Sequence, residues 1–153
     1  MSVSFSNLLT PTNLPFNDRI LQDASLLATI AMPAGSALVS TTNINLTEVV
    51  PFPVTETINV LVGYGASANG NANATNGVVY LQHAEAASGV ANASNWLNIP
   101  TLGTQPLVAA ATIAAATYTF KLPPGCKQFI RASARWGDAS NLADANLTVQ
   151  LLF

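Results

Sequence analysis

The sequence predicts an all-β, single-domain, jelly-roll-like antiparallel β-sandwich that follows an extended N-terminal arm. About eight short segments alternate apolar and polar residues with a period of two, which is typical of half-buried strands. Loops rich in Gly, Pro, Asn and Ser separate these segments, and no long stretch has a convincing helical period. Many short strands with turn-rich connections favour a sandwich or a jelly roll over other architectures.

Residues 1–17 have the composition of an extended arm. Pro11 and Pro15 lie among Ser, Thr and Asn, and each proline removes an amide donor and disfavours helix in the residue before it. The arm carries apolar side chains that could contact a partner: Phe5, Leu8, Leu9 and Phe16. We therefore expect an arm over 1–17 and a β-sandwich domain over 18–153.

The β-domain opens on an ambiguous stretch, because 21–31 fits either a short helix or a strand. Beyond it, the alternation predicts strands at 37–46, 56–64, 78–83, 96–99, 107–113, 117–121, 127–136 and 146–153. The small-residue stretches 63–77 and 84–95 have no hydrophobic anchor, so we expect exposed, mobile loops there.

The predicted strand over 127–136 separates two sets of side chains. One face carries Ile130, Ala132, Ala134 and Trp136. The other face carries Phe129, Arg131, Ser133 and Arg135. Because successive strand side chains point to opposite faces, the two sets should lie on opposite sides of the sheet.

The charge content is unusually low. Charged residues make up 8% of the chain, against about 25% in soluble domains. Half of the residues are hydrophobic, so the chain can bury a core. Its composition is not that of a disordered protein. With a net charge of −2, little repulsion separates one copy from another. This favours a subunit packed against other protein, with a charge-poor monomer as the alternative.

The composition also limits the partners and the location. Phosphate binding rests on Lys and Arg, and the chain has only five of them, so we expect no nucleic-acid partner. No run approaches the roughly 18 apolar residues of a membrane span. The N-terminus lacks a basic region followed by a long apolar run, so we expect no secretory signal and synthesis in a cytoplasm.

Few residues could support catalysis or bind a metal. His83 and Cys126 are the one histidine and the one cysteine; a nucleophilic pair would require them to meet, and we expect a half-buried histidine and a structural cysteine. One His and one Cys cannot supply the four ligands of a zinc site. Asp138 and Asp144 are the nearest calcium candidates, with a solvated loop as the simpler interpretation. The sequence predicts no catalytic residue, metal or cofactor.

Two tryptophans offer either anchors or sugar platforms. Trp96 lies beside Asn95 and Asn98, and Trp136 lies beside Asp138. Sugar-binding sandwiches stack sugar rings on exposed aromatic side chains and bind hydroxyl groups with amides and carboxylates. A tryptophan at the end of a strand is more often a core residue or an interface anchor. Both interpretations stay open from the sequence.

A series of short motifs runs through 57–153. Val79-Tyr80-Leu81-Gln82-His83-Ala84 precedes Asn95-Trp96-Leu97, and Phe120-Lys121-Leu122-Pro123-Pro124-Gly125 precedes Phe129-Ile130-Arg131-Ala132. In this order they resemble the cement, or decoration, proteins of tailed-bacteriophage capsids, in particular the Bordetella-phage type. The first 50 residues match that family little.

The resemblance implies a jelly-roll-like dimer or trimer on the exterior of a virion. Such a protein binds the major capsid protein and bridges its neighbouring copies, and the arm with Phe5, Leu8, Leu9 and Phe16 would lie on the capsid surface. Two alternatives remain. One is another virion or appendage protein, such as a tail, head-fibre or pilus-like subunit. The other is a carbohydrate-binding β-sandwich module.

Overall fold

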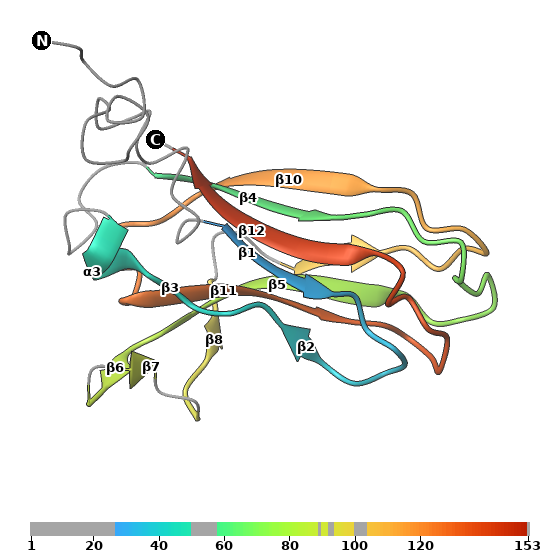
Figure 1. Cartoon of the computed structure of the whole chain (residues 1–153), viewed down its shortest axis with the longest axis horizontal. Coiled ribbons are helices and arrows are strands. Elements are labelled where there is room, and N and C mark those ends of the chain that lie inside the picture. The colour runs from blue at the N-terminus through green and yellow to red at the C-terminus, as the bar shows by residue number, and fades with distance from the viewer. Residues whose placement is uncertain (1–26, 50–57, 89, 92–93, 100–103, 153) are drawn as a thin grey trace, which may run out of the picture.

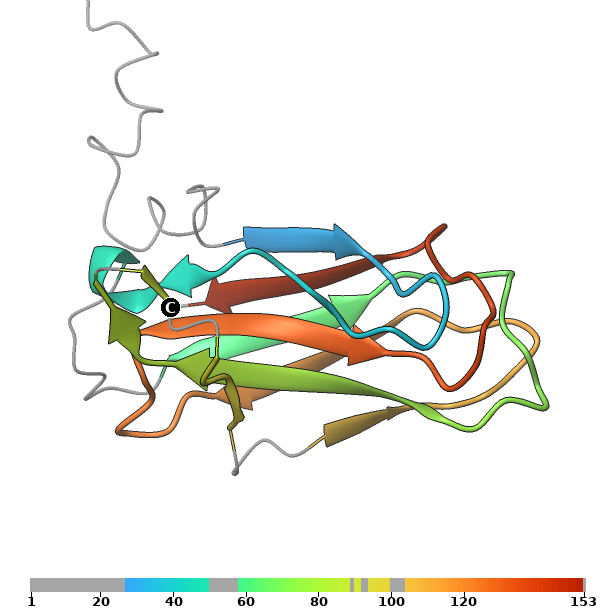
Figure 2. The same ribbon diagram turned by 90° about the horizontal axis from the view of Figure 1, so that it is seen from below.

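The computed structural model is an antiparallel β-sandwich made of two packed sheets (Figures 1 and 2). It describes residues 27–49, 58–88, 90–91, 94–99 and 104–152. The predicted arm, with Phe5, Leu8, Leu9 and Phe16, lies outside the described residues, as does its boundary with the β-domain.

The first sheet has four strands in the order β1-β12-β4-β10. Its strands are β1 (Leu27–Ala31), β12 (Asn146–Leu152), β4 (Asn59–Tyr64) and β10 (Ala116–Lys121). All three pairings are antiparallel. The ambiguous stretch at 21–31 is therefore a strand from Leu27 onward, because it pairs along its whole length with β12.

The second sheet has the order β2-β11-β5-β8, with β3 also paired to β11 and β9 to β5. Its strands are β2 (Val39–Ser40), β3 (Ile44–Asn45), β11 (Phe129–Arg135), β5 (Gly77–Ala84), β8 (Leu97–Asn98) and β9 (Thr104–Leu107). In Figure 1 this sheet lies below the first one, with β5 and β11 at its centre.

The strand order confirms the predicted jelly-roll type of sandwich. The first strand, β1, pairs with the last one, β12. Most successive connections pass from one sheet to the other, as from β4 to β5 and from β11 to β12. A jelly roll interleaves its strands in this way, so that segments far apart in the sequence become neighbours within each sheet.

The core lies between the sheets and follows the predicted alternation. In β12, Leu147, Val149 and Leu151 are fully buried. In β11, one of the two faces is fully buried: Ile130, Ala132 and Ala134, continued by Trp136 just beyond the strand. On the other face Phe129 and Ser133 are buried as well. Apolar area removed from water contributes roughly 25 cal/mol per Å², so these two strands supply much of the stabilising burial. Trp136 is the largest of the fully buried side chains.

Two predicted strands differ from the strands of the structure. The strand predicted at 37–46 is broken into β2 and β3 around Thr41, which bonds to Ala132 through both its backbone N–H and its side-chain hydroxyl. The strand predicted at 107–113 was wrong: β9 ends at Leu107, and Ala109 N–H donates to the Asn76 side chain instead of to a strand. At Ala109 the side-chain oxygen of Asn76 thus replaces the carbonyl oxygen of a neighbouring strand as the acceptor.

Two small elements were not predicted. The stretch 84–95 contains a short hairpin of β6 (Ala86–Ala87) and β7 (Val90–Ala91). A four-residue helical turn, α3 (Leu46–Val49), follows β3. Asn45 Oδ1 accepts from Thr47 N–H at 3.2 Å, which is the bond a helix N-cap makes. In the described part of the chain, no helix has the length and apolarity needed to cross a membrane.

Candidate functional site

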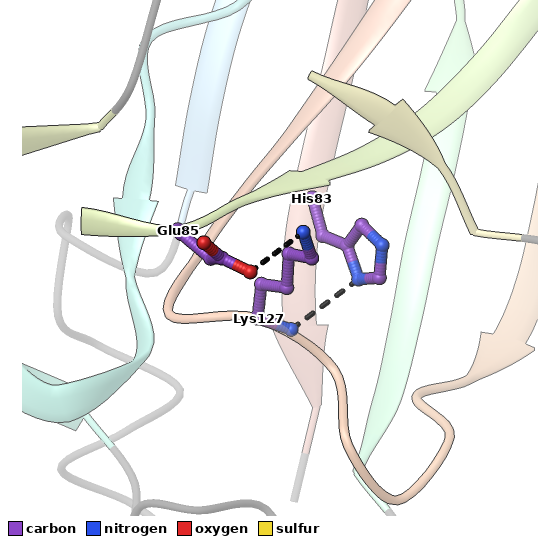
Figure 3. A network of polar contacts seen from close by, with 3 residues as sticks. All are labelled: His83, Glu85 and Lys127. Atoms are coloured by element: carbon purple, nitrogen blue, oxygen red, sulfur yellow. Dashed lines mark hydrogen bonds and ion pairs between the residues drawn. The ribbon is translucent and has the colours of Figure 1, made fainter. Parts of the chain in front are cut away.

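His83 and Cys126 come near one another in the fold but do not form a reactive pair. His83 lies near the end of β5, and its Nδ1 accepts a hydrogen bond at 3.3 Å from the backbone N–H of Lys127, the residue after Cys126 (Figure 3). That bond occupies the Nδ1 lone pair and leaves the proton of the neutral ring on Nε2. Burial, and then the charge of Lys127, lowers the pKa of His83.

The Cys126 thiol is poorly suited to nucleophilic attack. Its side chain is buried, and burial raises the pKa of the thiol to about 12. Only the thiolate is strongly nucleophilic, so Cys126 remains protonated at neutral pH. Lys127 is paired with Glu85, whose Oε1 lies 2.9 Å from the lysine Nζ (Figure 3). This cluster joins the end of β5 to the approach to β11.

Asp138 and Asp144, the calcium candidates, bind loops instead of meeting each other. Asp138 accepts from Asn71 Nδ2 at 2.6 Å and from Ser140 N–H at 2.7 Å. Asp144 accepts from the Ser67 hydroxyl at 2.6 Å. The Ser140 backbone N–H lowers the pKa of Asp138, and the Ser67 hydroxyl lowers that of Asp144. Among the described residues no group of His, Cys, Asp or Glu could hold a metal ion.

These bonds also correct the expected character of the loop over 63–77. Residues 63–64 belong to β4. Ser67 is buried, and its backbone pairs in both directions with Ile113. A polar residue can anchor a loop when its hydroxyl donates to a carboxylate, and this anchor carries no apolar signal in the sequence.

Trp136 is a core residue and cannot serve as a sugar platform. Its side chain is fully buried between the sheets. The carbon that a side chain at Gly77 would add lies only 2.9 Å from Trp136 Cε3, so the ring packs directly against the backbone of β5. This overturns its interpretation as an exposed anchor. Trp136 continues the fully buried face of β11 to which Ala134 belongs, and this is why its ring lies in the core.

Trp96, the other tryptophan, lies on the outer face of the second sheet. Its ring is partly buried, and the Arg131 guanidinium carbon lies 4.0 Å from the ring centroid. A guanidinium over an indole face is a cation–π contact worth about 0.5–2 kcal/mol. Trp96 is thus held in place by Arg131 of β11, a residue far from it in the sequence.

Gln82, on β5, bonds to side chains from β11 and β8. Its Oε1 accepts from Arg131 Nε at 3.0 Å and from the Ser133 hydroxyl at 2.8 Å, while its Nε2 donates to Asn98 Oδ1 at 3.1 Å. The two donors at Oε1 fix which way the amide points. Ser133 also bonds to the Ser40 hydroxyl at 2.8 Å. The outer face therefore carries an ordered polar network from β2 across to β8.

A hollow of about 480 Å³ opens beside this network. We call it the Trp96 groove; it is lined by Leu38, Tyr80, Gln82, Trp96, Leu97, Asn98 and Arg135. A second hollow of about 250 Å³ shares Tyr80 and Arg135 with it and continues toward Thr75 and Gly137. The alternation of β11 predicted that Arg131 and Arg135 share a face, but nothing predicted that Tyr80 and Gln82 would lie beside them.

The outer face of the first sheet is different in character, and we call it the neutral face. It consists of Leu27, Thr29, Ala31, Asn59, Leu61, Gly63, Thr117, Thr119, Lys121, Asn146, Thr148, Gln150 and Leu152. These residues alternate with the core residues of their strands and lie in register across the sheet. Lys121 is the one charged side chain among them.

The fold has distant structural likenesses among solved structures. No protein-family model and no curated protein matches the chain. The K1 cleaved adhesin domain of Lys-gingipain from Porphyromonas gingivalis W83 is 12% identical over 74% of this chain, with a TM-score of 0.42. The match spans 61% of that domain, and a likeness at this level says nothing about function.

Proposed function

We propose that the protein is a capsid cement protein, which binds the outer surface of a phage head and bridges neighbouring major capsid protein subunits. The proposal rests on the jelly-roll topology, on the low charge content and on the ordered motifs that resemble the cement family. In this role the surface of the domain carries out the function, and no reaction centre is required.

The observation that carries the proposal is the neutral face. A protein interface must strip water from the groups it covers, and removing water from a charge costs far more than removing it from a hydroxyl or an amide. The threonines at 29, 117, 119 and 148 and the leucines at 27, 61 and 152 can be covered without burying an unpaired charge. Their hydroxyl groups remain able to make hydrogen bonds across an interface.

The mechanism would be multivalent. Each oligomer would engage several capsid subunits, so that the second contact forms at the high effective concentration set by the first. Modest contacts at each site then hold the particle together. The arm, with Phe5, Leu8, Leu9 and Phe16, would add buried apolar area to the same attachment.

The chemistry of the described residues agrees with a structural role. The Cys126 thiol stays protonated, and His83 is engaged through Nδ1. Asp138 and Asp144 each accept hydrogen bonds from loop residues. The side chains best suited to catalysis are thus used to hold the fold.

Co-sedimentation with capsids tests the proposal. The full-length chain should sediment with expanded capsids built from the major capsid protein of the same genome, but should not bind the free capsid subunits. Thr29→Glu places a charge on the neutral face and should weaken capsid binding at least about tenfold, which is 1.4 kcal/mol. Thr112→Glu is the matched control, because Thr112 is equally an exposed threonine but lies in the loop before β10.

Two results would contradict the proposal. One is that the unmodified chain fails to sediment with the capsids; the other is that both glutamate variants bind as it does. Deleting residues 1–17 should leave the β-domain folded, as judged by its thermal transition, and weaken attachment. Labelled protein found on tails or fibres instead of heads would favour the other virion roles.

A further inference from the structure

The Trp96 groove has the size and lining of a small-molecule site. Its volume of about 480 Å³ falls within the roughly 300–1,000 Å³ of typical ligand pockets. Aromatic, amide and cationic side chains line one hollow, on the opposite side of the sandwich from the neutral face. Any ligand bound there would leave the proposed capsid contact free.

Trp96, one of the two aromatic residues of the groove, is positioned before any ligand arrives. Arg131 packs on the Trp96 ring at 4.0 Å, which restricts the rotation of both side chains. Tyr80 projects from the same face of β5 as Gln82, and both are partly or largely buried. Aromatic rings held in this way offer flat apolar surfaces, onto which the apolar faces of sugar rings can pack.

The polar groups of the groove are equally ordered and are mainly donors. Because Asn98 Oδ1 accepts from Gln82 Nε2, its own amide nitrogen is directed away from that bond and remains a donor. Arg135 is exposed and anchored by a bond from its Nε to the Ser36 carbonyl at 3.1 Å. Among the described residues its terminal nitrogens have no hydrogen-bond partner, so they can contact a ligand. Donors fixed in advance lose little entropy on binding.

The charge of the groove points to an anionic ligand. Within the described residues, the ion pair is between Lys127 and Glu85, and neither Arg131 nor Arg135 has a carboxylate partner. Arg131 is partly buried, and this burial lowers its pKa. Arginine pairs well with a carboxylate because its planar fork can donate two parallel hydrogen bonds.

We propose that the Trp96 groove binds an acidic saccharide, with a sugar ring packed on Trp96 and its carboxylate bound by Arg135. The amide nitrogen of Asn98 donates to a sugar hydroxyl group. The adjoining hollow toward Thr75 and Gly137 gives space for a second sugar ring, since Tyr80 and Arg135 line both hollows. A nucleic acid fits less well, because two arginines supply few phosphate contacts.

An oligosaccharide array tests this binding with the full-length chain. The array carries glycans that contain uronic or sialic acids, together with the same glycans as methyl esters, which have the same rings but no charge. We expect binding to acidic members and at least about tenfold weaker binding to their esters. Affinity for the best acidic member is then measured by calorimetry.

Three variants and one control locate the site. Trp96→Ala, Arg135→Gln and Asn98→Ala should each weaken binding, the first two by at least about tenfold. Lys121→Gln removes one positive charge from the opposite face and should change affinity less than twofold. Thermal melting of each variant confirms that it is folded, and Arg135, being exposed, can be replaced without disturbing the core.

Several outcomes would overturn the proposal. They are an array with no acidic glycan bound, equal binding of the acids and their esters, and undiminished affinity in both Trp96→Ala and Arg135→Gln. Leu38 and Leu97 are about half exposed at the rim of the groove, at 50% and 46%. If Leu38→Glu dissociates an oligomer in light scattering, a second copy of the chain covers the groove and the saccharide assignment is wrong.

Discussion

Replacing Trp136 with alanine should remove about 4 kcal/mol from the free energy of unfolding. The side chain is fully buried, and a tryptophan buries roughly 150–250 Å². At about 25 cal/mol per Å² this burial contributes about 4–6 kcal/mol. Truncations of buried tryptophan cost about 3–5 kcal/mol once the cavity is counted. A domain is stable by only about 5–15 kcal/mol, so the variant should be close to unfolding.

The other tryptophan supplies a matched control. Trp96→Ala makes the same chemical change, but Trp96 lies on the outer face and its described ring contact is with Arg131. We expect this variant to lose about 1 kcal/mol, which is the size of one partly exposed cation–π contact. The two variants should therefore differ by about 3 kcal/mol, or by roughly 6–12 °C in melting temperature.

Urea unfolding followed by circular dichroism measures this difference. All three proteins are compared at one protein concentration, since association would stabilise them to different extents. The slope of the free energy with urea should stay the same if the variants change stability alone. Equal losses for the two variants, or a loss below about 1 kcal/mol for Trp136→Ala, would refute the placement of Trp136 in the core.

Two further predictions concern the backbone of β5 and the acid side of the stability profile. Gly77→Ala should destabilise the protein by about 1–3 kcal/mol in urea unfolding, because the new carbon would lie 2.5 Å from the Arg135 carbonyl oxygen. Gly65→Ala is the control and should be near neutral, because its new carbon meets nothing closer than 3.5 Å. Equal losses of stability in the two variants would contradict the close packing at Gly77. The folded state lowers the pKa of Asp138 and Asp144, so their stabilising effect is present above their ordinary value of about 4 and is lost as the pH falls through their lower folded values. Their replacement by asparagine should flatten the loss of stability measured by urea unfolding below about pH 4, and an unchanged acid profile would show that these bonds contribute nothing.

The faces of the long strands could be predicted from the sequence because one side of each strand is buried. The alternation of Ile130, Ala132 and Ala134 fixes the core side of β11, and Leu147 and Val149 do the same for β12. A shift of one residue would expose every one of these side chains. The alternation therefore determines which face of each long strand is buried, and this is what predicts the sandwich.

The short elements could not be predicted, because side chains rather than periodicity decide them. Thr41 interrupts the strand over 37–46 with a side-chain bond to Ala132 N–H. Asn76 takes the Ala109 N–H and ends the strand predicted at 107–113. These partners lie 91 and 33 residues away in sequence, and a period-two pattern contains no information about them.

The Trp96 groove could be predicted only in part, for the same reason. The sequence indicated Trp96, beside Asn98, as a candidate anchor or sugar platform, and the alternation placed Arg131 and Arg135 on one face. It could not show that the cross-strand register sets Arg131 opposite Gln82. The two tryptophans also looked alike in sequence, yet one is in the core and the other at the surface.

The copy number of the chain in purified virions tests the cement role most directly. Quantitative mass spectrometry measures the ratio of this protein to the major capsid protein in particles of the phage that encodes both. We expect a simple stoichiometric ratio that survives washing of the particles, since copies of a cement protein cover the whole head. A chain absent from the virion, or present in only the few copies of a tail component, would contradict the account.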